Sequence, residues 1–260
     1  MVKIPFFWDY GNPPRNRRDE KLQTVGEGDP IFIQKFKGLR AIVEQKVDIQ
    51  HLKVLGITSS IAGEGKTLSC ALLGRELAAT GRKKVLLVDV DIRKGDLTRG
   101  MGLRRSPGIT EYLLGSATLQ QVLKATDVPN LFLVACGAET SSPADLLAGE
   151  KFKSFIKDMR DKYDTILIDT PPILAVADTL TIREMADGFI VLCRAGFTPR
   201  GMLKQALEEL GEKYVLGAVL NCVEGRSDHY YQKYYGSYYQ KSKPPLALVS
   251  EAKSRAAGKP

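Results

Sequence analysis

The residues best suited to chemistry lie in a glycine-bearing loop at 59–67, with the sequence Ser-Ser-Ile-Ala-Gly-Glu-Gly-Lys-Thr. Gly63 and Gly65 allow backbone N–H groups to close around phosphate oxygens, because neither residue has a Cβ in the way. Lys66 can reach the β- and γ-phosphates of a nucleotide, and the Thr67 hydroxyl can ligate Mg²⁺. The loop therefore predicts a site for ATP with Mg²⁺.

The sequence on either side of this loop supports that interpretation. An apolar run at 52–58 predicts a buried strand before the loop, and a helical pattern at 66–80 follows it. The start of that helix adds partial positive charge. Ser60 departs from the usual G-x-x-x-x-G-K-[ST] pattern, and a chance glycine-rich turn is the alternative. The expected nucleotide-binding residues are Ser59, Ser60, Ile61, Ala62, Gly63, Glu64, Gly65, Lys66, Thr67 and Leu68.

Three aspartates follow apolar runs and could complete the site. Asp89 and Asp91 end the run at 84–90, and carboxylates two apart on an extended segment point to the same side. They could hold Mg²⁺ or accept a proton from an attacking hydroxyl. Asp169 ends another run and could help to fix Mg²⁺. The alternative is that such residues merely cap turns.

We expect Asp89 to be the base, with Asp91 and Asp169 supporting Mg²⁺, although Asp89 and Asp91 could exchange roles. The expected catalytic set is Lys66, Asp89, Asp91 and Asp169, and the expected metal set is Thr67, Asp89, Asp91 and Asp169.

Strand-like and helical patterns alternate along the chain. The sequence predicts strands at 52–58, 84–90, 131–135, 165–169, 188–193 and 214–221. It predicts helices at 30–50, 66–80, 145–162, 174–186 and 198–211. This alternation is typical of an α/β fold with a mostly parallel sheet flanked by helices. Ligands of such sheets bind at the carboxyl ends of the strands, where the acidic motifs fall.

Length and composition limit the remaining possibilities. The chain has 260 residues, 43% of them hydrophobic, which is enough for one α/β core. We expect a flexible leader at 1–29, a phosphate-loop domain at 30–223 and a flexible basic tail at 224–260. No apolar run is long enough for a membrane span and the N-terminal run is too short for a signal peptide, so we expect a cytoplasmic protein. Four scattered cysteines and two histidines do not suggest disulfides or a metal cluster.

The motifs together resemble the bacterial tyrosine kinase (BY-kinase) family. Its apolar-D-x-D-x-R motif is matched at 86–93, and its apolar-D-x-x-P motif is matched at 166–171. The resemblance covers roughly residues 30–240 and implies a P-loop NTPase fold of the Min/Par-like kind. It also implies an ATP-dependent protein-tyrosine autokinase that regulates exopolysaccharide biosynthesis and export. Asn221, after the last predicted strand, would read the edge of the adenine by the same resemblance.

Six of the ten tyrosines cluster in the tail, where the surrounding residues are polar. Burial explains such a cluster poorly, because packed tyrosines would be spread over periodic apolar faces. The alternative to a chemical role is docking of a partner on the aromatic rings. The resemblance implies that neighbouring subunits phosphorylate these residues, which are Tyr230, Tyr231, Tyr234, Tyr235, Tyr238 and Tyr239.

The resemblance also implies partners. These are other copies of the chain, a transmembrane chain-length or activator protein that recruits it to the inner face of the membrane, and a tyrosine phosphatase. Nucleic acid is not expected, and a solvated tail is the simpler interpretation of the net charge of +4 at 224–260. The family's ring-forming E-x-x-R-x-x-R helix is matched only in part, by Gln34, Lys37 and Arg40.

Two other functions remain open. One is a positioning or partitioning ATPase of the Min/Par type, which carries a second lysine early in its phosphate loop, where this chain has Ile61. The other is a nucleotide-bound regulatory subunit that docks a membrane partner without catalysis.

Overall fold

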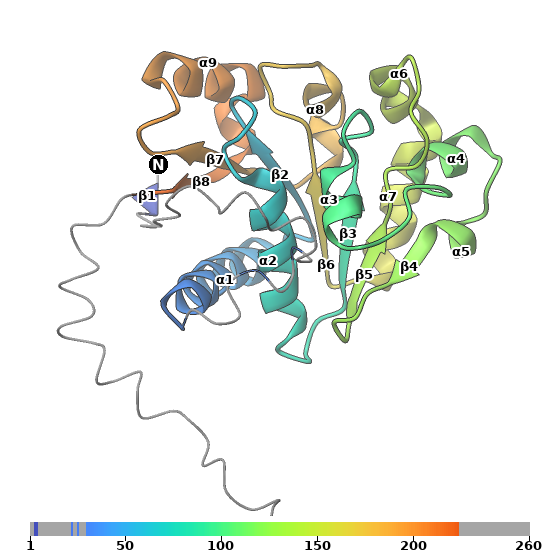
Figure 1. The fold of residues 1–260 in the computed structure, drawn as a ribbon, viewed down its shortest axis with the longest axis horizontal. Helices are drawn as coiled ribbons and strands as arrows, with labels where there is room; N and C mark the ends of the chain where they lie inside the picture. The colour runs from blue at the N-terminus through green and yellow to red at the C-terminus, as the bar shows by residue number, and fades with distance from the viewer. Residues whose placement is uncertain (1–2, 5–21, 23–24, 26–29, 224–260) are drawn as a thin grey trace, which may run out of the picture. The chain divides into compact units, whose positions relative to one another are not determined.

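The apolar runs of the sequence assemble into one sheet in the computed structural model, which describes residues 3–4, 22, 25 and 30–223 (Figure 1). The tail at 224–260 and most of the leader at 1–29 lie outside the described residues. The strands are β1 (Lys3–Ile4), β2 (Val54–Ser59), β3 (Val85–Asp89), β4 (Leu123–Ala125), β5 (Leu131–Val134), β6 (Thr165–Asp169), β7 (Gly188–Arg194) and β8 (Val215–Asn221).

The sheet has the order β1-β8-β7-β2-β6-β3-β5-β4. Its neighbouring strands are parallel except for β4, which pairs with β5 in the antiparallel direction. The α/β fold with a mostly parallel sheet is therefore confirmed. Because β3 and β6 are neighbours in register, Asp89 lies opposite Asp169 at their carboxyl ends. The register thus brings two of the three expected acids together at the carboxyl ends of two central strands.

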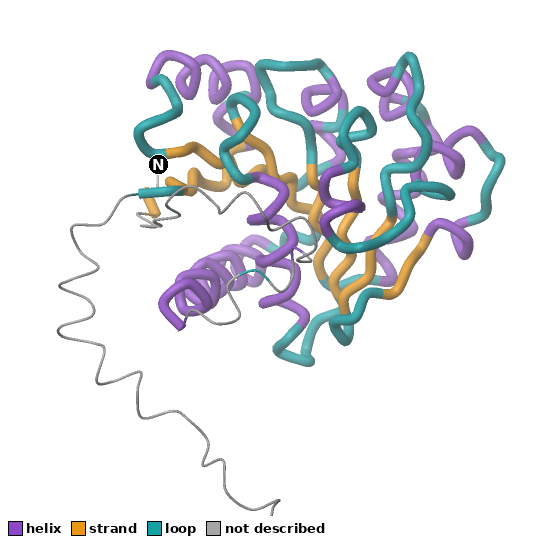
Figure 2. Tube along the Cα trace, viewed as in Figure 1, coloured by secondary structure: helices purple, strands orange, loops and turns teal. Residues whose placement is uncertain are grey.

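Helices connect the strands and cover both faces of the sheet (Figure 2). They are α1 (Pro30–Gln50), α2 (Lys66–Ala78), α3 (Asp96–Gly100), α4 (Ile109–Leu114), α5 (Leu119–Val122), α6 (Pro143–Ala148), α7 (Glu150–Lys162), α8 (Asp178–Thr181) and α9 (Arg200–Leu210). Short 3-10 turns occur at Arg183–Met185 and Glu212–Tyr214.

Alternation along each strand divides the core into two layers. On β3, Val85 and Leu87 pack in the layer that contains α1 and α2. Leu86 and Val88 of the same strand pack in the opposite layer, which contains α4, α7 and α9. Both faces of β3 are therefore buried, which explains why its sequence is a continuous apolar run.

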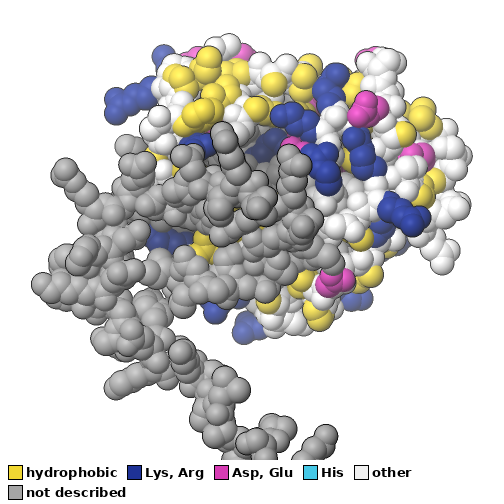
Figure 3. All heavy atoms as spheres, in the orientation of Figure 1, with side chains coloured by type: hydrophobic (Ala, Val, Ile, Leu, Met, Phe, Trp, Pro, Cys, Tyr) yellow, Lys and Arg dark blue, Asp and Glu magenta, His cyan; other side chains and the backbone are white. Residues whose placement is uncertain are grey.

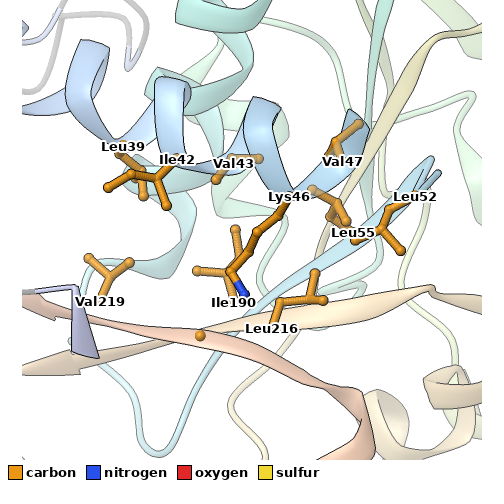
Figure 4. A pocket seen from close by; sticks show the side chains of 11 residues that line it. Leu39, Ile42, Val43, Lys46, Val47, Leu52, Leu55, Ile190, Leu216 and Val219 are labelled. Atoms are coloured by element: carbon orange, nitrogen blue, oxygen red, sulfur yellow. The ribbon is translucent and has the colours of Figure 1, made fainter. Parts of the chain in front are cut away.

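A shallow apolar groove lies between α1 and the sheet (Figure 4). Leu39 and Val43 face it from α1, and Ile190 and Leu216 face it from β7 and β8. None of the expected site residues lines this groove, so it is distinct from the phosphate loop.

The structure differs from the sequence prediction in several places. Gly149, whose backbone is extended, divides the helix expected at 145–162 into α6 and α7. The segment expected to be helical at 174–186 contains only the single turn of α8 followed by a 3-10 turn. The sequence did not predict α3, α4, α5 or β4, nor β1, which pairs with β8 from within the expected leader.

The residues compared with the family's ring helix have different surroundings. Gln34 and Lys37 are exposed on α1. Arg40 instead lies 3.5 Å from Glu44 on the same helix and donates a hydrogen bond to the Glu76 carbonyl of α2, at 3.4 Å. Its guanidinium is therefore engaged within the subunit. Among the described residues, no helix is both long and apolar enough to cross a bilayer.

A close approach between β2 and β7 gives a first prediction. A Cβ on Gly56 would lie 2.1 Å from the ring of Phe189, its register partner on β7. The substitution Gly56→Ala should therefore force the buried ring to move and should lower the free energy of unfolding by about 1–3 kcal/mol. Urea denaturation at constant m-value measures this change.

Gly201→Ala is the matched control, because a Cβ at this helical position meets nothing within 4 Å. It should raise the free energy of unfolding by about 0.4–1 kcal/mol. Equal stability of the two variants would contradict the proposed contact.

Candidate functional site

The loop between β2 and α2 has a backbone that its glycines make possible. Gly63 and Gly65 have φ angles of 87° and 91°, in the left-handed region that other residues rarely adopt. Gly65 is the N-cap of α2 and offers no side chain to pair with the first N–H groups of the helix. These groups are therefore available to an anion. Ser60, which stands in place of a glycine, is fully buried.

Two side chains hold this loop in shape. Glu64, only 1% exposed, accepts a hydrogen bond from the Ile61 N–H at 2.9 Å and another from the Thr198 hydroxyl. Thr198 in turn accepts from the Arg194 N–H at 2.7 Å. The segment between β7 and α9 is thus fastened to the phosphate loop. Thr198 is not among the residues expected from the sequence, because it lies 134 residues from Glu64 and belongs to no motif.

Asn221 supports the same loop from the end of β8. Its side-chain amide donates to the Glu64 carbonyl at 3.0 Å, and its side-chain oxygen accepts from the Cys222 N–H at 2.8 Å. A Cβ on Gly65 would lie 2.2 Å from this amide nitrogen, which is a second reason for glycine there. Contact with adenine stays a prediction.

Lys66 joins the loop to the acidic residues. Its Nζ lies 3.0 Å from Asp91 Oδ2 and 3.6 Å from Asp169 Oδ1, and it donates to the Thr67 hydroxyl at 3.0 Å. Burial by itself would lower the pKa of Lys66, but the carboxylates of Asp169 and Asp91 raise it overall. The lysine therefore remains charged within the protein.

Burial dominates the electrostatics of Asp169. The residue is fully buried, and neither carboxyl oxygen has a hydrogen-bond partner among the described residues. Burial raises the pKa of Asp169 to about 7, against the opposing effect of Lys66. Near neutral pH this carboxyl is therefore poised between its two protonation states.

Asp89 is bound by a helix that the sequence did not predict. Its Oδ2 accepts from the Thr98 hydroxyl at 2.6 Å and from the Thr98 N–H at 2.9 Å, and Thr98 lies within α3. Burial raises the pKa of Asp89 to about 6, and the bonds from Thr98 oppose this shift. Its Oδ1 is buried with no hydrogen-bond partner among the described residues.

The structure brings Lys66 and the three aspartates together, beside the phosphate loop and Asn221. Among the described residues, however, no three His, Cys, Asp or Glu side chains are placed to hold a metal ion by themselves. The unpaired oxygens of Asp89 and Asp169 fit a cation, but its remaining ligands would have to come from elsewhere, as phosphate oxygens and water do for Mg²⁺. The six tail tyrosines lie outside the described residues.

This arrangement defines a class of protein. Left-handed glycines, a lysine at the start of a helix, and aspartates at the ends of parallel strands are the features of a P-loop nucleotide-binding domain. In agreement, a family model described as an AAA domain matches residues 52–214.

Relatives narrow the class to a family. The chain is 32% identical over 229 residues to tyrosine-protein kinase YwqD of Bacillus subtilis, covering 86% of this chain and 96% of YwqD. It is 30% identical to tyrosine-protein kinase ptk of Acinetobacter johnsonii, covering 83% of this chain but 30% of that protein. The chain thus spans about a third of the length of several curated relatives. It belongs to the bacterial tyrosine kinase family.

Solved structures agree with this assignment. The BceF tyrosine kinase domain is 27% identical, with a TM-score of 0.73 over 80% of this chain and 84% of that domain. The septum site-determining protein MinD of Pyrococcus horikoshii, complexed with Mg-ADP, is 24% identical. Its TM-score is 0.56 over 65% of this chain and 70% of MinD, so MinD shares the fold.

The buried carboxyls predict a pH dependence of stability. Asp89 and Asp169 keep their protons to higher pH in the folded than in the unfolded state, where the pKa is about 3.8. The stabilisation is complete below pH 3.8 and is lost as the pH rises through about 6 and then about 7. Without nucleotide and Mg²⁺, the free energy of unfolding should therefore fall between pH 5 and pH 8, by roughly 4 kcal/mol.

Asp169→Asn should remove most of this dependence, because an amide cannot ionise. Asp161→Asn, at an exposed position on α7, is the control and should leave it unchanged. Urea denaturation across the pH range makes the measurement, and a wild-type protein more stable at pH 8 than at pH 5 would contradict the expectation.

Proposed function

We propose that this chain transfers the γ-phosphoryl group of ATP to protein tyrosine. The observation that carries the proposal is the position of Lys66, which extends from the phosphate loop to within 3.0 Å of Asp91 and 3.6 Å of Asp169. Lys66 can therefore bind the phosphates, and carboxylates that can bind a metal ion or accept a proton lie beside it at the carboxyl ends of the strands. Membership of the bacterial tyrosine kinase family supports tyrosine as the acceptor.

In this proposal, residues Ser59–Leu68 bind the nucleotide and Lys66 contacts its β- and γ-phosphates. Thr67 would ligate Mg²⁺, with Asp91 and Asp169 supporting it, and the ion would neutralise negative charge on the phosphates. Asp89 accepts the proton of the tyrosine hydroxyl, for which a pKa of about 6 is well matched. Asn221 contacts the adenine.

We further propose that the acceptors are the tail tyrosines of a neighbouring subunit. Each added phosphate carries about −1.5 to −2 charges at pH 7. Several of them would outweigh the net charge of +4 of residues 224–260 and repel adjoining subunits. Phosphorylation should therefore loosen the homo-oligomer, while unphosphorylated subunits associate.

In the cell, the proposed autokinase regulates exopolysaccharide biosynthesis and export. A transmembrane chain-length or activator protein recruits it to the inner face of the membrane and promotes its activity, and a tyrosine phosphatase reverses the modification. These partners follow from the family.

The Min/Par-type ATPase remains the second candidate, because MinD shares the fold. Ile61 in place of that group's early lysine argues against it, as does the tyrosine cluster. A non-catalytic regulatory subunit is the third candidate, and an assay of the purified chain separates it from a kinase.

The substitution Lys66→Met tests the proposed function. It should reduce phosphotyrosine formation from labelled ATP by at least about 100-fold, because the phosphates lose their cation. The fold should survive, since Asp169 can take up a proton when the lysine is absent. Lys204→Met, at an exposed position on α9, is the control. Parental autophosphorylation by the Lys66 variant, with circular dichroism unchanged, would show that the assigned site is wrong.

Asparagine variants separate the roles of the two neighbouring acids. Asp89→Asn should lower kcat by about 10²–10⁴-fold with little change in ATP affinity, because general-base catalysis contributes that much. Asp91→Asn should instead weaken the dependence on Mg²⁺. Single-turnover rates at several Mg²⁺ concentrations make the comparison, and the opposite pattern would exchange the two assignments.

Mixing two chains, neither of which can label its own tail, tests transfer between subunits. One chain carries Lys66→Met, and the other keeps its active site but has phenylalanine at all six tail positions. Label from ATP should appear on the tail of the Lys66 variant, as mapped by mass spectrometry. Absence of label there, when the wild-type chain labels itself, would restrict the reaction to a tail in cis.

A further inference from the structure

A second cation lies close to Asp91 in the chain, on the turn that follows β3. Arg93 is two residues beyond Asp91, and this turn is closed by hydrogen bonds from the N–H groups of Lys94 and Gly95 to the Asp91 carbonyl, at 3.1 and 2.7 Å. The Arg93 side chain is 49% exposed. Arg93 ends the motif at 86–93 but is not among the expected site residues.

Asp178 holds this arginine from the buried side. Its Oδ2 lies 3.6 Å from Arg93 Nε, and its side chain is only 1% exposed. The neighbouring Thr179 hydroxyl donates to the Pro171 carbonyl at 2.7 Å, which ties the start of α8 to the segment after Asp169. The ion pair thus joins the two loops that leave the carboxyl ends of β3 and β6.

The contact with Asp178 leaves donors of the guanidinium available. Nε is the nitrogen nearest to the carboxylate, at 3.6 Å, and among the described residues Asp178 is the one ion-pair partner of Arg93. A planar guanidinium fork matches the geometry of a phosphate, with which it can form two parallel hydrogen bonds. Burying the Asp178 carboxylate costs free energy because the group loses its water, and orienting the Arg93 guanidinium is a reason to bury it.

The surface around this arginine also favours an anion. Lys and Arg side chains gather near α3 and the neighbouring loops (Figure 3). Arg93 and Lys94, on the turn before α3, and Arg99, within α3, are exposed. The carboxylates of Asp91 and Asp169 already pair with Lys66. A nucleotide with three phosphates brings more negative charge to this edge than Lys66 alone can balance.

We propose that Arg93 binds the phosphoryl group that this site transfers, and that Asp178 is its positioning residue. The proposal rests on the proposed kinase function. Transfer breaks the bond between the γ-phosphorus and the β–γ bridging oxygen, which leaves with ADP. A new bond forms from that phosphorus to the tyrosine oxygen, whose proton passes to a carboxylate. Arg93 stabilises the charge on the three non-bridging oxygens throughout this step.

The test compares Arg93→Met with Arg99→Met in the full-length chain. Arg99 is also an exposed arginine beside an aspartate, Asp96, and makes a matched control. Calorimetry gives the affinities for ADP and for a non-hydrolysable ATP analogue, and a labelled-ATP assay gives kcat. Arg93→Met should lower kcat and analogue affinity by roughly 10- to 100-fold and leave ADP affinity within about twofold. Arg99→Met should behave like the parent.

Asp178→Asn tests the positioning role. It should lower kcat by about tenfold in the parent chain but have no further effect in the Arg93→Met chain, because the residue acts through the arginine. Arg93→Lys should recover only part of the loss, since an ammonium lacks the fork.

Binding of a phosphotyrosine peptide with the sequence of the tail shows whether Arg93 holds the phosphate of ATP or the phosphate of the product. If Arg93→Met weakens binding of this peptide rather than of the ATP analogue, the arginine holds the phosphate after transfer, and phosphate recognition still stands. The proposal is overturned if Arg93→Met matches Arg99→Met in every assay, or if it weakens ADP as much as the analogue. A wild-type chain that binds no nucleotide would instead refute the proposed function.

Discussion

One buried lysine balances the carboxylates at the carboxyl edge of the sheet. Asp89, Asp91 and Asp169 are each at most 2% exposed, and like charges so close together in a medium of low dielectric repel strongly. Lys66 offsets two of them directly. Thr98 donates a hydrogen bond to one oxygen of Asp89. Proton uptake at Asp169 further reduces the repulsion between the carboxylates.

This balance links the binding of anions to the binding of cations. Any phosphate that attracts Lys66 competes with Asp91 and Asp169 for the same ammonium. The carboxylates that lose their counterion then gain affinity for another cation, and by linkage a bound cation makes Lys66 more available to phosphate. A nucleotide and a metal ion are therefore expected to bind more tightly together than separately, as a consequence of charge and burial at this edge.

The sequence predicted most of the site at the carboxyl ends of the strands, because the strands, the glycine loop and the lysine each follow from local sequence patterns. A run of apolar residues such as 84–90 is typical of a strand buried on both faces, and parallel strands place their final aspartates side by side. Glycine positions and the lysine of the loop are equally local. The sequence could not predict α3, because five residues are too short for a helical period to be recognised. Thr98, Thr198 and the pairing of Arg93 with Asp178 depend on contacts between segments far apart in the chain.

The contacts that the sequence left out join the phosphate loop to the molecular surface. Thr198 binds the buried Glu64, and the residue before it, Phe197, is 47% exposed. A Cβ on Gly63 would lie 3.8 Å from the Phe197 ring, and the Arg194 guanidinium lies 5.1 Å from the centre of that ring. Hydrophobic side chains gather over α9 and its neighbouring loop (Figure 3), where Met202 is also exposed. The hydrogen bond from Thr198 to Glu64 joins the segment that carries Phe197 to the phosphate loop. A change in the backbone of the loop must therefore either break this hydrogen bond or move Phe197 with it.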